Sequence, residues 1–235
     1  MGPALPAPSG ASPAGDAAPA LDMEMGPDPD LDAIGRRLGL SRSSLDRDLL
    51  RRYARLWAPF REEAFDLLEV GFGGAASLLG WLAWFPNARV VGLDVRRLHL
   101  PELEPFGGRC VVIHGDQDDP AALVPLVREF RFRIVIDDGS TAFPDQQTLL
   151  AALYPALEPG GFYCAESFWD SRQDPIDPRS LPIPGMQELM ERVCRALSLG
   201  QRDQEPPIID RIVRQTAAVT VMPRSIVLER AGAAR

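Results

Sequence analysis

The sequence predicts an α/β protein with a Rossmann-like, doubly wound sheet, mostly parallel and closed by a C-terminal antiparallel β-hairpin. In the middle of the chain, short apolar runs alternate with helix-length segments. This alternation is typical of parallel strands covered by helices on both faces. Only Pro223 and Arg224 separate the last two apolar runs. A connection that short requires an antiparallel hairpin.

The individual elements follow from the hydrophobic period. Strands are predicted at 66–71, 89–94, 110–115, 132–137 and 161–165, and the hairpin at 216–222 and 225–230. Helices are predicted at 75–85, 119–130, 145–157 and 186–199. Helical signals begin near Asp30, and Ser43-x-x-Asp46 matches a capping box. The apolar stripe that follows ends at Pro59 and comprises Leu45, Leu49, Leu50, Tyr53, Leu56 and Trp57.

Composition divides the chain in two and excludes several functions. Residues 1–30 are rich in Pro, Ala and Gly and predict a disordered tail, which leaves 31–235 as a single domain. All 25 basic residues are arginine, so lysine chemistry is excluded. The 33 acidic residues give a net charge of −8, which argues against nucleic acid as a partner. With only His99 and His114, a histidine metal cluster is excluded as well.

The cysteines and the chain termini indicate the compartment. Cys110, Cys164 and Cys194 are widely spaced and odd in number, so we expect buried, reduced thiols in a cytoplasmic protein. The N-terminus lacks the order of a signal peptide, and no apolar stretch is long enough to span a bilayer. We expect no membrane partner, and a homo-oligomer stays open.

Polar and glycine residues at the predicted strand ends indicate a ligand site, because ligands of open α/β sheets bind there. Glu69, Gly71 and Gly73 surround the first strand end, and Gly71-x-Gly73-x-x-Ala76 also fits a dinucleotide fingerprint. Asp94 ends the second strand and could hold a ribose or cap a helix. Asp116 and Gln117 follow the third strand and suit an adenine edge. Asp137 and Asp138 end the fourth.

An acid at Glu69 suits a cationic amino group better than a pyrophosphate. A ligand with an amine, a carboxylate, a ribose and an adenine satisfies the whole set, and S-adenosylmethionine is such a ligand. A nicotinamide-dependent dehydrogenase is the competing interpretation of the glycine turn.

Tyr53 to Trp169 resembles the class I S-adenosylmethionine-dependent methyltransferases of the macrocin/mycinamicin sugar O-methyltransferase group, and also the cephalosporin-hydroxylase-like proteins. The matching stretches are LEVGFGGAASLLGW (68–81), WFPNARVVGLDV (84–95), HGDQDDPAAL (114–123), IVIDDGS (134–140) and LYPALEPGGFYCAES (153–167), with a Tyr53 motif upstream. The resemblance implies that the cofactor is bound by Glu69, Gly71, Gly73, Ser77, Asp94, Asp116, Gln117 and Asp137. Ser77 could equally cap its own helix.

The resemblance also locates the catalytic residues and shows a departure. In this group a histidine that acts as base follows DDGS, whereas this chain has Thr141. A threonine hydroxyl cannot accept a proton near neutral pH. The group binds Mg²⁺ through the second Asp of DDGS and a Glu-Asp pair; here Asp138 and Glu166 remain, but Ser167 replaces the second Asp. Weak Mg²⁺ binding and its loss both stay open, and Asp138 and Glu166 could instead cap backbone amides.

The sequence therefore predicts an O-methyltransferase that acts on a hydroxyl of a small natural product of the sugar or polyketide type, as in antibiotic biosynthesis. Its predicted catalytic residues are Asp138, Thr141 and Glu166. The alternative is a methyltransferase fold that no longer transfers methyl and instead catalyses a cyclisation or rearrangement, or acts as an assembly partner. Phe168 and Trp169 could wall the substrate site, and the proline-rich segment 174–185 could cover it.

Overall fold

The protein is described from a computed structural model, which covers residues 30–166, 185–200 and 207–232. Nearly all of the predicted disordered tail at 1–30 lies outside these residues. Phe168, Trp169 and most of segment 174–185 lie outside them too. The predictions for those segments therefore stay predictions.

A seven-stranded sheet with the order β3-β2-β1-β4-β5-β7-β6 forms the centre of the fold. β1 to β5 pair in parallel, whereas β7 pairs antiparallel with both β5 and β6. The predicted Rossmann-like class with a terminal hairpin is confirmed. The strands are β1 (Asp66–Val70), β2 (Arg89–Asp94), β3 (Cys110–His114), β4 (Phe132–Asp137), β5 (Phe162–Glu166), β6 (Thr216–Met222) and β7 (Ser225–Arg230).

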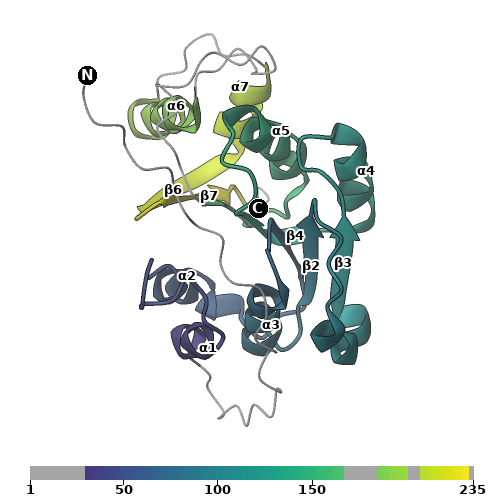
Figure 1. The fold of residues 1–235 in the computed structure, drawn as a ribbon. Helices are drawn as coiled ribbons and strands as arrows, with labels where there is room; N and C mark the ends of the chain where they lie inside the picture. The colour runs from purple at the N-terminus through teal and green to yellow at the C-terminus, as the bar shows by residue number, and fades with distance from the viewer. Residues whose placement is uncertain (1–29, 167–184, 201–206, 233–235) are drawn as a thin grey trace, which may run out of the picture.

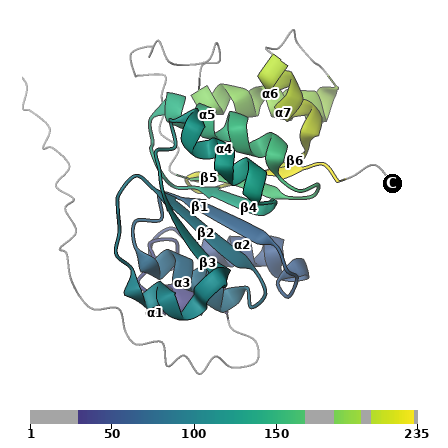
Figure 2. The same cartoon turned by 90° about the vertical axis from the view of Figure 1, so that its right-hand side faces the viewer.

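Helices cover both faces of the sheet. Figures 1 and 2 show α1 (Leu31–Arg37), α2 (Leu50–Trp57) and α3 (Ala75–Trp84) on one face. The other face carries α4 (Pro120–Glu129), α5 (Phe143–Leu153), α6 (Gly185–Leu199) and α7 (Pro207–Gln215). Short 3₁₀ segments lie at Ala58–Phe60, Pro101–Arg109 and Tyr154–Ala156.

The position of each strand explains its hydrophobic pattern. All five residues of β1 are buried, because both faces of this central strand meet helices. Alternate residues of β1 enter two separate core clusters: Leu67 packs with α1 to α3, and Leu68 packs with α4 to α7. β3 is at the edge of the sheet, and its Val112 and His114 are exposed.

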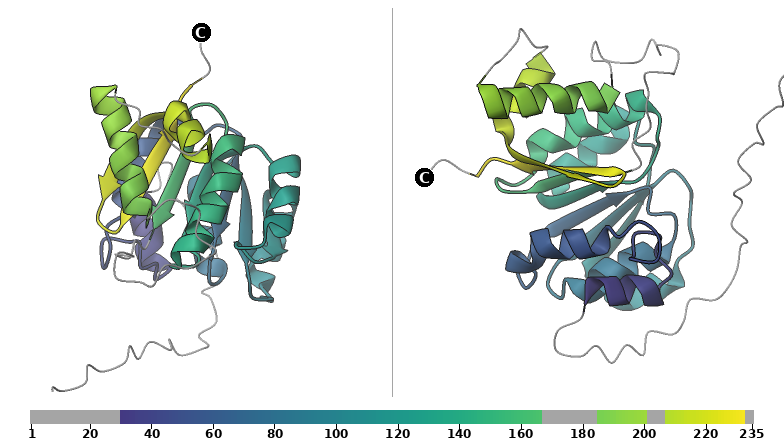
Figure 3. Two further views of the ribbon diagram at one scale, coloured as in Figure 1. Left: turned by 90° about the horizontal axis from the view of Figure 1, so that it is seen from above. Right: turned by 90° about the vertical axis from the view of Figure 1, so that its left-hand side faces the viewer.

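The terminal hairpin extends the sheet beyond β5. Arg224, the second residue of the two-residue turn, has a left-handed backbone with φ 59°, whereas the ring of Pro223 restricts the first residue to negative φ. β7 lies between β5 and β6, and its Leu228 is buried in the same cluster as Tyr163. Figure 3 shows the α6 helix lying along the yellow hairpin. The hairpin is therefore covered on this face by a helix, as the parallel strands are.

The segment between α1 and α2 differs from the prediction. The Ser43-x-x-Asp46 capping box is wrong, because residues 41–47 form turns and α2 begins at Leu50 with no side-chain cap. Leu45, expected on the apolar stripe, is 76% exposed. Asp32 organises this segment instead: its carboxylate accepts hydrogen bonds from the Ser44 backbone N–H at 2.6 Å and Arg36 at 2.7 Å.

Other differences are smaller. The predicted helix at 145–157 begins at Phe143 and ends in a 3₁₀ turn, and α7 was not predicted. The prediction of buried thiols is wrong for Cys194, which is exposed, and Cys110 is only half-buried; Cys164 is buried. Among the described residues, no helix is long and apolar enough to cross a membrane.

Candidate functional site

The carboxyl ends of β1, β2, β3 and β4 meet around one cavity of about 360 Å³. Four of the predicted cofactor residues lie on its wall, namely Gly71, Asp94, Asp116 and Gln117. Asp138, Gly139 and Ser140 line it from the β4 end. The cavity therefore lies where a doubly wound sheet binds its ligand, since the strand order reverses between β1 and β4.

Two glycines allow the β1 and β4 ends to approach closely. Gly71 has φ +74°, and a Cβ there would lie 2.3 Å from the Cα of Gly139. A Cβ on Gly139 would lie 1.9 Å from the Oε1 of Gln117. Only glycine accommodates both the positive φ and the contact at position 71. The wall of the cavity at this point is backbone.

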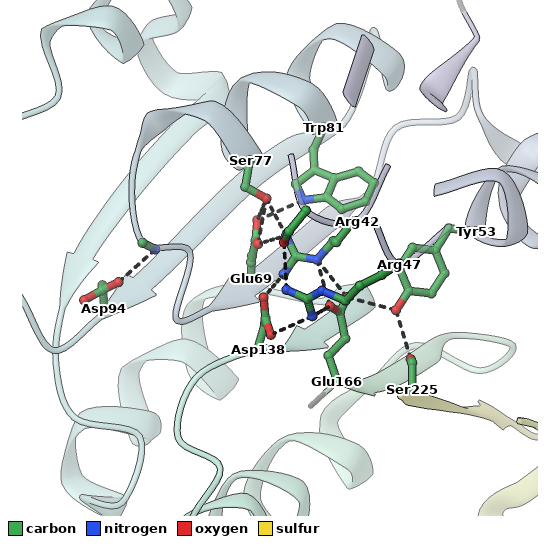
Figure 4. A network of polar contacts seen from close by, with 12 residues as sticks. Arg42, Arg47, Tyr53, Glu69, Ser77, Trp81, Asp94, Asp138, Glu166 and Ser225 are labelled. Atoms are coloured by element: carbon green, nitrogen blue, oxygen red, sulfur yellow. Dashed lines mark hydrogen bonds and ion pairs between the residues drawn. The ribbon is translucent and has the colours of Figure 1, made fainter. Parts of the chain in front are cut away.

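Asp94 is fixed at the end of β2. Its Oδ2 accepts the backbone N–H of Gly73 at 3.1 Å, and its Oδ1 accepts that of Arg96 at 2.9 Å. Burial raises the pKa of Asp94, but the Arg96 hydrogen bonds and the Gly73 N–H outweigh it, so the pKa lies below its usual range. The carboxylate is therefore ionised at neutral pH, in the state that accepts hydroxyl hydrogen bonds. This contact with the glycine turn is shown in Figure 4.

Gln117 is buried and its carbonyl oxygen accepts the Ser140 N–H at 2.8 Å. This bond fixes the orientation of the amide. Its Nε2 is buried and has no hydrogen-bond partner within the described ranges. An unpaired amide donor beside a cavity suits a ligand with a polar edge, as predicted for adenine. The adjacent Asp116 is exposed.

Glu69 and Ser77 lie behind the glycine turn, outside the residues that line the cavity. The Glu69 carboxylate is fully buried and accepts bonds from the Ser77 hydroxyl at 2.7 Å and the Trp81 indole N–H at 2.8 Å. The cation that faces Glu69 is Arg42, whose Nη1 lies 2.6 Å from its Oε1. Ser77 does not cap its helix, which has Gly74 at the N-cap.

Arg42 gathers the acids of three strand ends. Its Nη2 lies 2.7 Å from Asp138 Oδ2, and its Nε donates to both oxygens of Glu166 at 2.9 Å. Arg47 lies on the outer side, with its Nη1 3.4 Å from Glu166 Oε2. Figure 4 shows both guanidinium groups between these carboxylates. The Tyr53 hydroxyl completes the shell by donating to Glu166 at 2.9 Å.

Burial and charge explain the protonation behaviour of these groups. Burial raises the pKa of Glu166, and the Arg42 charge opposes that shift. The pKa of Arg42 is raised by Glu166, Glu69 and Asp138 although burial acts to lower it. Burial raises the pKa of Asp137 to about 7, against the hydrogen bond that its Oδ2 accepts from Tyr163 at 3.0 Å.

The remaining predicted residues do not supply a base. Thr141 is exposed just before α5, and His99 is exposed in the segment after β2. His114 is exposed at the end of β3. The described residues thus bring no histidine into the cavity lining.

Arg42, Arg47 and Arg96 are the site residues that sequence reasoning missed. Arg42 and Arg47 flank the Ser43-x-x-Asp46 pattern, and that local pattern carries no information about their long-range partners. One signal was available: six carboxylates converge on the strand ends of a chain without lysine, and buried carboxylates require a counter-charge. An arginine had to supply it, but the sequence does not say which.

The cavity residues fit the adenosine part of S-adenosylmethionine. The unpaired Gln117 amide, the ionised Asp94 and the backbone wall at Gly71 are the observations that support the fit. The predicted metal ligands Asp138 and Glu166 do not fit Mg²⁺ in the same way. Their oxygens face two guanidinium groups, and within the described ranges no group of three or more His, Cys, Asp or Glu could hold a metal ion.

The chain is similar to known O-methyltransferases. No protein-family model matches the chain. It is 28% identical over 199 residues to mycinamicin VI 2''-O-methyltransferase of Micromonospora griseorubida, over 78% of this chain and 49% of that protein. It is 35% identical over 126 residues to demethylmacrocin O-methyltransferase of Streptomyces fradiae, over 50% of this chain and 31% of that protein. The chain thus spans less than half the length of these two relatives.

Solved structures lead to the same class. MycE methyltransferase from the mycinamycin pathway, in complex with Mg and SAH, is 26% identical and superposes with a TM-score of 0.72. The match covers 87% of this chain and 55% of that one. The fold is the Rossmann-like fold of class I methyltransferases. Within this class, the resemblance to the macrocin/mycinamicin sugar O-methyltransferase group is confirmed.

Proposed function

We propose that this chain binds S-adenosylmethionine and transfers its methyl group to a hydroxyl of a small natural product of the sugar or polyketide type. The observation that carries the proposal is the strand-end cavity, in which Gly71, Asp94 and Gln117 present a backbone wall, an ionised carboxylate and an unpaired amide. The curated relatives named above are O-methyltransferases of such compounds.

The geometry suggests how the cofactor lies. Asp94 would accept hydrogen bonds from the two ribose hydroxyls, and the Gln117 amide would donate a hydrogen bond to the adenine edge. The methionine part would then extend past Gly71 toward Asp137 and Asp138. In the reaction, the acceptor oxygen forms a bond to the methyl carbon, the S–C bond breaks with its electron pair passing to sulfur, and the hydroxyl proton is released. Holding the two reactants in line supplies much of the rate in such a transfer.

The acceptor class is inferred from the relatives. A second solved MycE structure, 25% identical and with a TM-score of 0.72, contains mycinamycin VI together with Mg and SAH. The match covers 54% of that chain, so the part of the relative beyond it has no counterpart in this sequence. We therefore assign the class of acceptor and leave the regiochemistry to experiment.

Two observations favour a second function. Thr141 stands where the related group has its base, and Asp138 and Glu166, which correspond to metal ligands of that group, are paired with arginines. A methyltransferase fold that positions a substrate for cyclisation or rearrangement, or that acts as an assembly partner, would need neither that base nor the metal. Such a protein would bind S-adenosylhomocysteine without forming it.

Calorimetric titration with S-adenosylhomocysteine and, separately, with NAD⁺ tests the cofactor. We expect 1:1 binding of S-adenosylhomocysteine and none of NAD⁺; the reverse would establish the dehydrogenase interpretation.

Incubation with S-adenosylmethionine and glycosylated polyketide acceptors should then give products heavier by one methyl group. Cofactor binding without any methylated product across sugar and polyketide acceptors would support the second function. In that case, turnover that needs no S-adenosylmethionine would identify it.

The setting of the protein is inferred from composition. The net charge of −8 supports a small-molecule partner over nucleic acid, and the absence of a CxxC motif supports the cytoplasm. Self-association to a homo-oligomer is measured directly by light scattering.

A further inference from the structure

Asp138 and Glu166, the two acids that correspond to metal ligands in the related group, already have a cationic partner. All four of their carboxylate oxygens face a guanidinium. Arg42 reaches Asp138 Oδ2 and both oxygens of Glu166, and Arg47 lies 3.7 Å from Asp138 Oδ1. Mg²⁺ takes about six oxygen ligands at ~2.0–2.1 Å. An ion placed between these acids would meet two permanent positive charges, because arginine does not deprotonate in proteins.

Arg42 is built into this position. Its side chain is 5% exposed, and its Nη1 also donates to Glu69 at 2.6 Å and to the Ser77 hydroxyl at 2.7 Å. Glu69 and Glu166 are both fully buried. If Arg42 left, both buried acids would lose their nearest counter-charge. Removing one partner of a buried ion pair destabilises a protein, because the remaining charge is left uncompensated.

The loop that carries Arg42 is itself held in place. Asp32 binds the Ser44 N–H and hydroxyl, and backbone bonds from Leu49 and Leu50 to the Arg42 carbonyl close the turn before α2. The guanidinium therefore approaches from a fixed backbone rather than from a free surface side chain. Arg42 and Arg47 together place two positive charges against Asp138 and Glu166 without any ligand from solution.

We propose that the guanidinium of Arg42 is the resident cation of this site, takes the place of the divalent metal, and makes the reaction of this chain independent of Mg²⁺. The inference rests on the proposed function only in assigning the site to methyl transfer. The charge replacement itself is a property of the folded chain and is tested without turnover.

The test is a Mn²⁺ titration of the full chain, followed by electron paramagnetic resonance of free Mn²⁺. We expect no binding up to about 1 mM Mn²⁺, and equal S-adenosylhomocysteine affinity in EDTA and in Mg²⁺. Binding of one equivalent below 1 mM, displaced by Mg²⁺ and lost in Asp138→Asn, would overturn the proposal. It would show that a metal displaces the arginine, or that residues outside the described ranges complete a metal site.

A variant provides the converse measurement. Arg42→Met keeps an unbranched side chain and removes its charge, so Asp138 and Glu166 should then take up Mn²⁺ at least 10-fold more tightly than the unaltered chain. The matched control is Arg89→Met, which removes an arginine paired with Asp66 at the opposite end of β1 and should leave Mn²⁺ binding unchanged. An Arg42→Met protein that folds and gains no Mn²⁺ affinity would count against the proposal.

If Arg42→Met does not fold, the double variant Arg42→Met/Glu69→Gln removes one buried negative charge with the positive one and serves for the same titration. The outcomes separate the two proposals. Mn²⁺ binding by the unaltered chain together with S-adenosylhomocysteine binding refutes the charge replacement and leaves the function standing. Failure to bind S-adenosylhomocysteine refutes the function, whatever the Mn²⁺ titration shows.

Discussion

At the scale of single residues, the site depends on positions where only one residue type fits. Gly71 combines φ +74° with a neighbouring Cα 2.3 Å from where a Cβ would stand. Three positions later, Gly74 has φ 178° and open space around its would-be Cβ. Both glycines lie in one glycine-rich stretch of the sequence, GFGGAAS at 71–77, yet only the first is required by its geometry. The motif alone could not separate them, since it records spacing and not backbone angles.

This difference predicts the effect of one substitution at each position. Gly71→Ser should abolish measurable S-adenosylhomocysteine binding in calorimetry and lower the melting temperature, because left-handed backbone costs ~1–2 kcal/mol for a residue with a Cβ and the β4 loop must move as well. Gly74→Ser is the control, because serine is a good N-cap and meets nothing there. Equal binding by the two variants would mean that the close approach of β1 and β4 does not shape the site.

At the scale of elements, the sequence predicted the sheet well and the segment before it poorly. The bounds of β2, β4, β6 and β7 are as predicted, because each is an apolar run that ends at polar or turn residues. Residues 38–49 misled the prediction, because Ser43 and Asp46 have capping-box spacing while tertiary contacts determine the chain path. Arg42 is separated by 27, 96 and 124 residues from its acidic partners Glu69, Asp138 and Glu166. No local pattern reports contacts at such separations.

Asp32 should be the residue on which the stability of this segment depends. Burial acts to raise its pKa, but the Ser44 hydrogen bonds and the charges of Arg51 and Arg36 outweigh it, so the pKa of Asp32 lies below its usual range. Asp32→Asn should therefore lower the free energy of unfolding by about 1–3 kcal/mol at pH 7 in urea titrations.

The pH dependence of that effect has a definite sign. A depressed carboxyl pKa stabilises the fold above the pKa of the unfolded chain, about 3.9, and this stabilisation is lost as the pH falls through the folded value. The difference between Asp32→Asn and the unaltered chain should therefore shrink below about pH 4. Asp30→Asn, at the N-cap of α1, is the control and should change stability little, because Asn caps as well as Asp. A difference that does not shrink as the pH falls below about 4 would show that the carboxylate charge is not what holds the segment.

At the scale of the whole molecule, one sheet joins two hydrophobic clusters. Trp57, Trp81 and Trp84 belong to the cluster under α1 to α3, while Leu228 of the hairpin lies in the cluster under α4 to α7. The sequence predicted both coverings from the alternation of strands and helices. It could not show which residues of β1 enter which cluster, because that depends on which helices cover each face of the folded sheet.

If the sheet makes the two clusters unfold cooperatively, a substitution in the cluster under α4 to α7 should also shift the unfolding transition of the tryptophans in the other cluster. Leu228→Ala should lower the free energy of unfolding by about 2–5 kcal/mol, and tryptophan fluorescence and far-UV circular dichroism should shift together in urea. Val221→Ala, on the same hairpin but 71% exposed, should change it by less than about 1 kcal/mol. A fluorescence transition that stays in place while the dichroism shifts would mean that the two faces unfold separately.

The reach of Arg42 across the sheet also bears on where this protein can be shortened. A shortened version that begins at β1 would retain every strand and every residue of the cavity lining, and by sheet topology alone it would look complete. It would nonetheless leave the buried carboxylates of Glu69 and Glu166 without Arg42, the cation that pairs with both of them. The smallest self-sufficient unit therefore includes α1 and the turn after it.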